Sequence, residues 1–101
     1  MSARYRVADA ALDDIDEIAD WMWSNDPDSG ADLRFIDAVY EAFGLLASQP
    51  GLGHKREDLT DLPVLFWTVM KSFAVIYRTG RPLEIVRVIR WTRDLADVLG
   101  N

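Results

Sequence analysis

The clearest alternation of hydrophobic and polar positions lies near the end of the chain. Two segments rich in β-branched and aromatic residues, 71–78 and 83–90, flank the tetrapeptide Thr79-Gly80-Arg81-Pro82. This pattern predicts a β-hairpin, with Pro82 in the turn or at the first residue of the second strand, because proline cannot donate a ladder hydrogen bond. With those four residues as the loop, two sets of side chains each share a face: Phe73, Val75 and Tyr77 with Val86 and Val88, and Ala74, Ile76 and Arg78 with Leu83, Ile85 and Arg87. Both faces contain apolar residues, so we expect the hairpin in the middle of a sheet, where a one-residue slip would exchange the faces.

A helical pattern occupies the first part of the chain. Asp9 is a suitable N-cap for a helix that runs to about Trp23. Its inward positions are Leu12, Ile15, Ile18 or Ala19, and Met22. The rest of its surface carries carboxylates: Asp13, Asp14, Asp16, Glu17 and Asp20. Three carboxylates on one face could hold a hard cation, but the segment has neither the glycine turn of a calcium loop nor a histidine at metal spacing. We therefore expect a solvated face and no metal site.

A second helical pattern follows a short turn. Pro27 suits the first position of a helix that runs to about Ala47, with Asp26 or Ser24 as its cap. The connection over 24–28 is short, which predicts an antiparallel helical hairpin whose two apolar stripes cover a common surface. The inward positions of the second helix are Ala31, Phe35 (or Leu33), Ile36, Val39, Ala42 or Phe43, and Leu46.

The remaining segments complete an α+β fold. Ser2–Val7 alternates like an edge or second-position strand, residues 54–63 form a loop with a short strand inside, and Val64–Met70 is a strand that leads into the hairpin. Arg93–Leu99 resembles a terminal helical turn or two. We expect one domain over residues 1–101, with an N-terminal strand, an antiparallel helical hairpin packed on a small, mainly antiparallel β-sheet, and a short C-terminal helix.

Composition narrows the class of protein. Half of the 101 residues are hydrophobic, which suffices for a packed core. There is no cysteine, so disulfides and thiolate chemistry are excluded, in keeping with a reducing cytoplasm. No secretory signal or membrane-spanning run is visible, so we expect a cytoplasmic protein without membrane contact. The four tryptophans are candidates for the core, or for an interface anchor where one is exposed: Trp21, Trp23, Trp67 and Trp91.

The net charge of −6 is unevenly distributed. Residues 1–50 have three basic and eleven acidic side chains, a balance of −8, whereas residues 51–101 have eight basic and six acidic, a balance of +2. The first half therefore repels nucleic acid, and contact with a polyanion would have to use the second half. Arginines gather in that half, and they either bind carboxylates or phosphates or pair with nearby acids such as Glu84. These arginines are Arg78, Arg81, Arg87, Arg90 and Arg93.

Candidate catalytic groups are few. His54 is the only histidine, and no serine stands in a Gly-x-Ser-x-Gly context that would make it a nucleophile. Gly51 and Gly53 follow a helix rather than a strand, which is the wrong context for a phosphate-binding loop. A general-base role for His54 is open, but an exposed loop histidine is the simpler interpretation.

The order of these segments resembles the ParE toxins of bacterial type II toxin–antitoxin modules, within the RelE/ParE superfamily. The resemblance covers nearly the whole chain, and although each piece is degenerate, their order and spacing together are specific. The pieces are Ala10–Ile18, Leu46–Pro50, Gly51–Leu59, Val64–Trp67, Phe73–Arg78, Ile85–Ile89 and Arg93-Asp94. The resemblance implies a growth-inhibiting toxin without a cofactor, held inactive in a hetero-oligomer with a ParD-like antitoxin, and DNA gyrase as its target.

Antitoxins of this type wrap the toxin with a C-terminal segment that folds on contact. An amphipathic helix in a groove, with an extended portion beside a strand, fits that description. The groove is expected between the helical hairpin and the sheet, and the arginines would attract an acidic tail. The apolar residues expected to contact the antitoxin are Phe35, Val39, Trp67 and Trp91.

The RelE relatives instead cut mRNA on the ribosome, and this chain departs from their pattern. They carry basic residues on the strand before the hairpin, whereas Val64–Met70 has none, and they end with a His or Tyr that residues 95–99 lack. Only Arg93 and Arg87 match cationic positions. We therefore expect a non-enzymatic, protein-binding toxin without direct nucleic acid binding. The alternatives are a RelE-like ribosome-dependent mRNA endonuclease that uses these two arginines with His54 or Tyr77, and a degenerate member that binds antitoxin but has lost toxicity.

Overall fold

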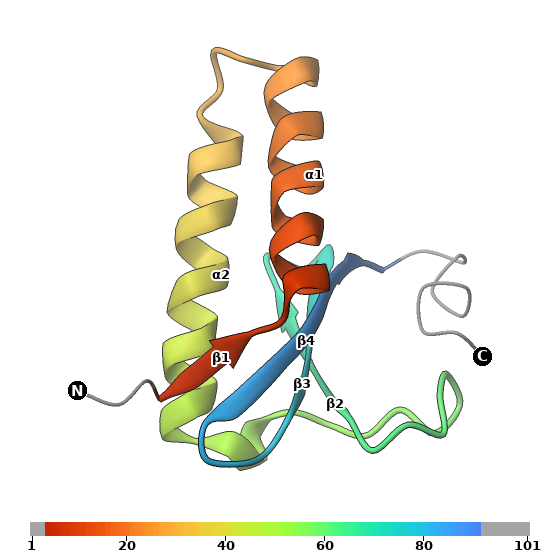
Figure 1. Cartoon of the computed structure of the whole chain (residues 1–101). Helices are drawn as coiled ribbons and strands as arrows, with labels where there is room; N and C mark the ends of the chain where they lie inside the picture. The colour runs from red at the N-terminus through yellow and green to blue at the C-terminus, as the bar shows by residue number, and fades with distance from the viewer. Residues whose placement is uncertain (1–3, 92–101) are drawn as a thin grey trace.

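Two antiparallel helices packed on one face of a four-stranded sheet make up the fold (Figure 1). The computed structural model describes residues 4–91. The elements are β1 (Tyr5–Val7), α1 (Asp9–Asn25), α2 (Ala31–Ser48), the 3-10 helix η1 (Pro50–Leu52), β2 (Leu65–Val69), β3 (Phe73–Arg78) and β4 (Leu83–Arg90). The expected α+β class is confirmed, whereas the predicted C-terminal helix lies outside the described residues. Neither α1 nor α2 has the length and hydropathy needed to span a membrane.

The sheet joins the start of the chain to its later part. Its strand order is β1-β4-β3-β2, with β1 parallel to β4 and the other neighbours antiparallel. Tyr5 lies opposite Leu83, and Val7 lies opposite Ile85. The N-terminal strand is therefore at one edge of the sheet, and β2 forms the other edge.

The register of the β3–β4 hairpin differs from the predicted one. Arg78 lies opposite Glu84 rather than Leu83, and a bulge near the turn leaves Val86 as an extra residue in β4. Leu83 and Ile85 consequently pack on the helix-facing side, and Val86 packs on the opposite side. The predicted faces of these three residues were wrong, because the longer loop shifts the register by one residue.

Each face of the sheet has its own core. The face toward the helices carries the larger cluster, in which Phe35 and Phe73 meet with ring centroids 4.8 Å apart. The opposite face carries a smaller cluster of Val64, Phe66, Ala74, Ile76 and Ile89, against which Leu59 and Trp91 pack. The expectation of apolar residues on both faces of the hairpin is confirmed, because the 54–64 segment covers the face that has no helix.

The inward stripes of the helices match the prediction except at Leu12. Ile15 in α1 and Val39 in α2 are buried as expected. Leu12 was placed inward but is 39% exposed, and its neighbour Ala11 is buried instead. Of the alternatives Phe35 and Leu33, Phe35 is the buried one, since Leu33 is 64% exposed.

The helix starts correct two predicted caps. Asp9 lies in the first turn of α1, because the N-cap is the residue before it, which makes no side-chain cap bond. The second helix begins at Ala31 and not at Pro27. Its N-cap is Gly30, in the left-handed region at φ 72°, and the Ser29 hydroxyl accepts a hydrogen bond from the Ala31 N–H at 3.1 Å. A glycine suits this position because other residues adopt a positive φ at a cost.

One carboxylate of α1 is buried instead of solvated. Asp14 accepts hydrogen bonds from Nε and Nη2 of Arg87, at 2.7 and 2.8 Å, and from the backbone N–H of Val88 at 3.0 Å. It is 8% exposed, so its predicted place among the solvent-facing acids was wrong. Because β1 pairs with β4 only as far as Ile85, the Val88 N–H lies beyond the edge strand, and the carboxylate takes the place of the missing strand partner. The hydrogen-bonded carboxylate also raises the pKa of Arg87.

We expect Asp14→Ala to lower the free energy of unfolding by about 3 kcal/mol, because it removes the acceptor of a half-buried guanidinium and of a buried amide. Denaturant unfolding measures the change. Asp13→Ala, at the exposed neighbouring position, is the control and should stay within about 0.5 kcal/mol of the parent chain. A similar small effect for both substitutions would contradict the structural role of Asp14.

Candidate functional site

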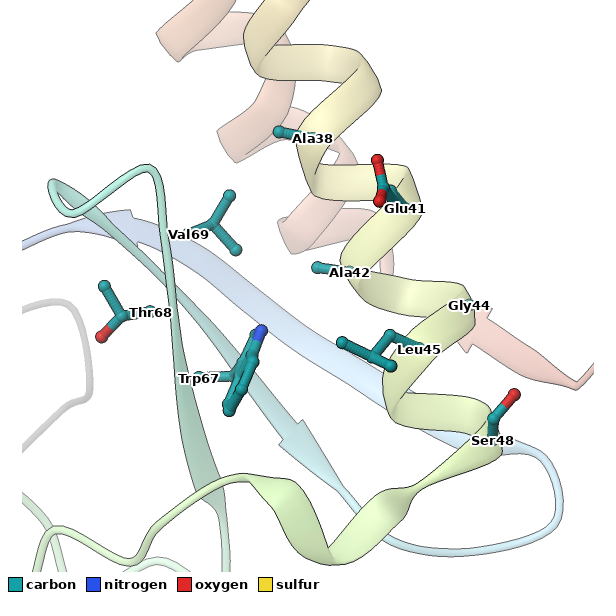
Figure 2. A pocket seen from close by; sticks show the side chains of 9 residues that line it. All are labelled: Ala38, Glu41, Ala42, Gly44, Leu45, Ser48, Trp67, Thr68 and Val69. Atoms are coloured by element: carbon teal, nitrogen blue, oxygen red, sulfur yellow. The ribbon is translucent and has the colours of Figure 1, made fainter.

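An apolar groove of about 460 Å³ runs between α2 and the edge strand β2 (Figure 2). Ala38, Ala42 and Leu45 line it from the helix, and Trp67 and Val69 line it from the strand. In Figure 2 the Trp67 indole stands between the strand and the helix, opposite Leu45. The polar residues among its lining are Glu41, Ser48 and Thr68.

Helical and strand spacing together build this groove. Ala38, Ala42 and Leu45 recur every three or four residues, so they share one side of α2, next to the core stripe. Trp67 and Val69 are two residues apart in β2 and therefore point to the same face of the sheet, the one the helices cover. The small alanines leave space that a larger side chain would fill.

The edge of β2 beside the groove is partly open. His54 and Phe66 exchange two backbone hydrogen bonds, of 2.9 and 2.8 Å, so Phe66 points its backbone polar groups away from β3. Thr68 lies two residues after Phe66 in β2, so its backbone N–H and C=O also point away from β3. Within residues 4–91 no other segment pairs with this part of the edge. An extended segment of another chain could add to the sheet here.

The four apolar residues expected to contact a partner occupy different places. Trp67 lines the groove between α2 and β2. Phe35 and Val39 have no exposed surface, so they support the groove wall from inside the core. Trp91 lies on the opposite face of the sheet, stacked on Phe66 with ring centroids 5.9 Å apart. Only Trp67 of the four therefore lines the groove.

One group of arginines gathers at the turn end of the sheet. Arg78 of β3 and Arg6 of β1 both form ion pairs with Glu84 of β4, which lies between them. Arg81 lies exposed in the turn of the same hairpin. Nη2 of Arg4 donates to the hydroxyl of the last residue of α2 at 2.7 Å, so the positive charge reaches the end of the groove. Within residues 4–91, four arginines and a single bound carboxylate lie at this end of the sheet, which is therefore cationic.

The other predicted arginines lie elsewhere. Arg87 is held by the carboxylate of Asp14. Arg90, at the far end of β4, places its guanidinium carbon 4.7 Å from the centre of the Trp21 ring, which is a cation–π contact. Arg93 lies outside the described residues. Within residues 4–91 the structure therefore does not bring the arginines of the second half into one patch.

The residues considered for catalysis have structural partners. The Tyr77 side chain is fully buried, and its hydroxyl donates to the Pro50 carbonyl at 2.7 Å and accepts from the Gly53 N–H at 2.8 Å. Burial raises the pKa of Tyr77. A Cβ at Gly53 would lie 2.4 Å from that hydroxyl oxygen, so glycine is required by the close approach. His54 is exposed and contributes its backbone to the bridge with Phe66. Among the described residues no cluster of three or more acids or histidines could hold a metal ion.

Sequence reasoning missed the residues that α2 contributes to the groove. Ala38 and Leu45 lie beside the predicted inward stripe, and their helical spacing is visible in the sequence. The pattern could have indicated a second, narrower apolar stripe on α2. It could not indicate which strand would face that stripe, because the strand order was not predictable from periodicity.

The described part of the chain is thus a small α+β domain that offers a groove and an open strand edge, which are features of a protein-docking module. Residues 5–95 match the family model described as ParE toxin of type II toxin-antitoxin system, parDE, and the chain belongs to this family. A solved structure entitled "Chromosomal ParDE TA system from P. aeruginosa" has the same fold. The two chains are 21% identical, with a TM-score of 0.67 over 85% of this chain and 92% of the other. None of the curated proteins compared with the chain matches it.

The cationic end of the sheet yields a pH prediction. Hydrogen bonds from Arg78 and Arg6 lower the pKa of Glu84. The stabilisation it provides is therefore present above the ordinary glutamate pKa and is lost as the pH falls through the lowered pKa of the folded state. We expect Glu84→Gln to cost at most about 1 kcal/mol near neutral pH, because both arginines are largely exposed, and the difference from the parent chain to vanish in acid. Denaturant unfolding at a series of pH values measures this difference.

Glu57→Gln in the exposed loop is the control. A loss of unfolding free energy in Glu84→Gln that persists in acid would disprove the ion-pair origin of the stabilisation.

Proposed function

We propose that this chain is the toxin of a ParDE-type module, that it inhibits growth by binding DNA gyrase without catalysing a reaction, and that a ParD-like antitoxin neutralises it. Membership of the ParE family carries this proposal. The solved structure of the same fold comes from a ParDE system, which supports an antitoxin as the partner. A cytoplasmic location follows from the proposed target.

We assign the antitoxin to the groove between α2 and β2. The apolar lining suits the hydrophobic side of an amphipathic helix, and the open edge at Thr68 suits an extended segment. Arg4 lies at the Ser48 end of the groove, and Arg81 lies in the nearby turn, where no ion pair within residues 4–91 involves it. An acidic tail leaving the groove at this end would find the cationic end of the sheet.

The geometry gives little support to the nuclease alternative. Stabilising charge on a phosphate requires a cation that can approach it, but Arg87 is tied to a buried carboxylate. The Tyr77 hydroxyl is buried and occupied by two backbone groups, so it is not placed for proton transfer to a substrate. These constraints favour a toxin that acts by occupying a protein surface.

Two assays on the purified chain separate the functions. Inhibition of DNA supercoiling by purified gyrase, without cuts in mRNA on translating ribosomes, is the expected result. In the nuclease alternative mRNA is cut, and Arg93→Ala abolishes the cutting. A chain that inhibits neither process and causes no growth defect would be the degenerate member of the family.

We expect Leu45→Asp to weaken antitoxin binding by at least about tenfold, because it places a charge in the apolar groove. Leu45 is 39% exposed, so the fold should survive the change. Calorimetric titration with the ParD-like protein of the same module measures the affinity. The control is Leu62→Asp, a substitution of another exposed leucine that lies in the loop outside the groove. Equal affinities for both variants would contradict the assignment of the groove.

A further inference from the structure

The helical hairpin extends beyond the sheet. In Figure 1 the last turns of α1 and the first turns of α2 rise past the ends of the strands. Two large apolar side chains in this part are exposed, Trp23 at 58% and Leu33 at 64%. Trp23 lies in the last turn of α1 and Leu33 in the first turn of α2, so both lie near the tip. These two side chains do not pack into the core, because no strand lies beneath this part of the hairpin.

Each helix carries a further exposed apolar residue closer to its base. Leu12 lies three helical turns before Trp23, and Tyr40 lies two turns after Leu33, so each shares a helix face with its partner at the tip. Both are 39% exposed. On α1, the side that carries Asp14 faces β4 and lies opposite Leu12 and Trp23. On α2, the side that carries Ala38 faces the groove and differs from the side of Leu33 and Tyr40. We call Leu12, Trp23, Leu33 and Tyr40 the outer apolar face.

The charges around this face are mostly negative. Asp16 and Asp20 lie between Leu12 and Trp23 along α1, and Asp37 lies between Leu33 and Tyr40 along α2; all three are exposed. Among the ion pairs of residues 4–91, none involves these carboxylates. The only basic residue in either helix is Arg34, which donates to the Ser29 carbonyl at the start of α2.

We propose that the outer apolar face is a second protein-docking surface, distinct from the groove, and that it binds a partner whose apolar residues are flanked by lysine or arginine. A second copy of this chain does not fit, because two such faces would bring unpaired carboxylates together. A basic partner would neutralise them while burying Trp23, the residue type most enriched in binding hot spots. On the proposed toxin function, on which this step rests, the face engages the target.

The face can be tested with a defined probe. The probe is a short amphipathic helical peptide with leucine on one side and lysine on the other, and the control peptide has glutamate in place of lysine. We expect amide chemical shifts of the isotope-labelled chain to move around the outer apolar face with the lysine peptide only. Trp23→Ser with Leu33→Ser should weaken binding at least about tenfold. Asp16→Lys with Asp37→Lys should weaken it similarly, because the attraction becomes repulsion. Shifts centred on the groove, or equal binding of both peptides, would overturn the proposal.

Growth inhibition in a bacterial host tests whether the toxin uses this face. The paired serine variant should lose growth inhibition while its far-ultraviolet circular dichroism and antitoxin affinity stay unchanged. The groove variant Leu45→Asp should remain toxic and is the matched control. Full toxicity of the paired serine variant would refute the role of the face in target binding but leave the toxin function standing. If the parent chain is not toxic, the proposed function fails, and the peptide experiment still decides the docking surface.

Discussion

The hydrogen-bonded pair of Asp14 and Arg87, with the amide of Val88, is the constraint on which the arrangement of α1 depends. A three-residue β1 cannot cover an eight-residue β4, so the far half of that strand would be an unpaired edge. The carboxylate binds that edge directly and fixes both the rotation of α1 and its height along the strand. Burying a charged pair costs desolvation free energy, which the hydrogen bonds between the two groups offset. The pair also defines which side of α1 faces the sheet.

The orientation of α1 determines which strands α2 covers and where it leaves a groove. With α1 over β4, the second helix covers the central strands and reaches toward β2, where its small residues leave a groove rather than a closed contact. The sides of the two helices that face neither the sheet nor the groove carry the outer apolar face. The core therefore uses only part of the apolar surface of the hairpin, and the unused part is divided between two separate surfaces.

The sequence predicted the element types and their order because the patterns are local. The alternation of side chains in 73–78 and the helical stripe through Phe35 and Val39 depend only on the local sequence, so they can be recognised without knowledge of the tertiary structure. The errors arise where a non-local contact decides the outcome. Asp14 looks like its solvated neighbours Asp13 and Asp16, and only the position of Val88 distinguishes it. The hairpin register depends on one extra residue in β4, and periodicity cannot show a bulge. Groove-lining residues are the hardest to predict from the sequence. Phe35 and Trp67 are both apolar there, and only the packing shows that Phe35 is buried in the core whereas Trp67 lines a groove.

The two proposed surfaces share α2, and this has a consequence for neutralisation. Leu45 faces the groove near the base of the helix, while Leu33 is exposed near its tip, on a different side of the helix. An antitoxin segment confined to the groove would leave the tip uncovered, so it could not compete for the target by overlap. Because the antitoxin is assigned to the groove and not to the tip, neutralisation then requires that its bulk outside the groove blocks the approach of a large target. A large protein is easily excluded in this way, whereas a small basic peptide is not. The neutralised toxin would therefore still bind a small basic partner at the outer apolar face.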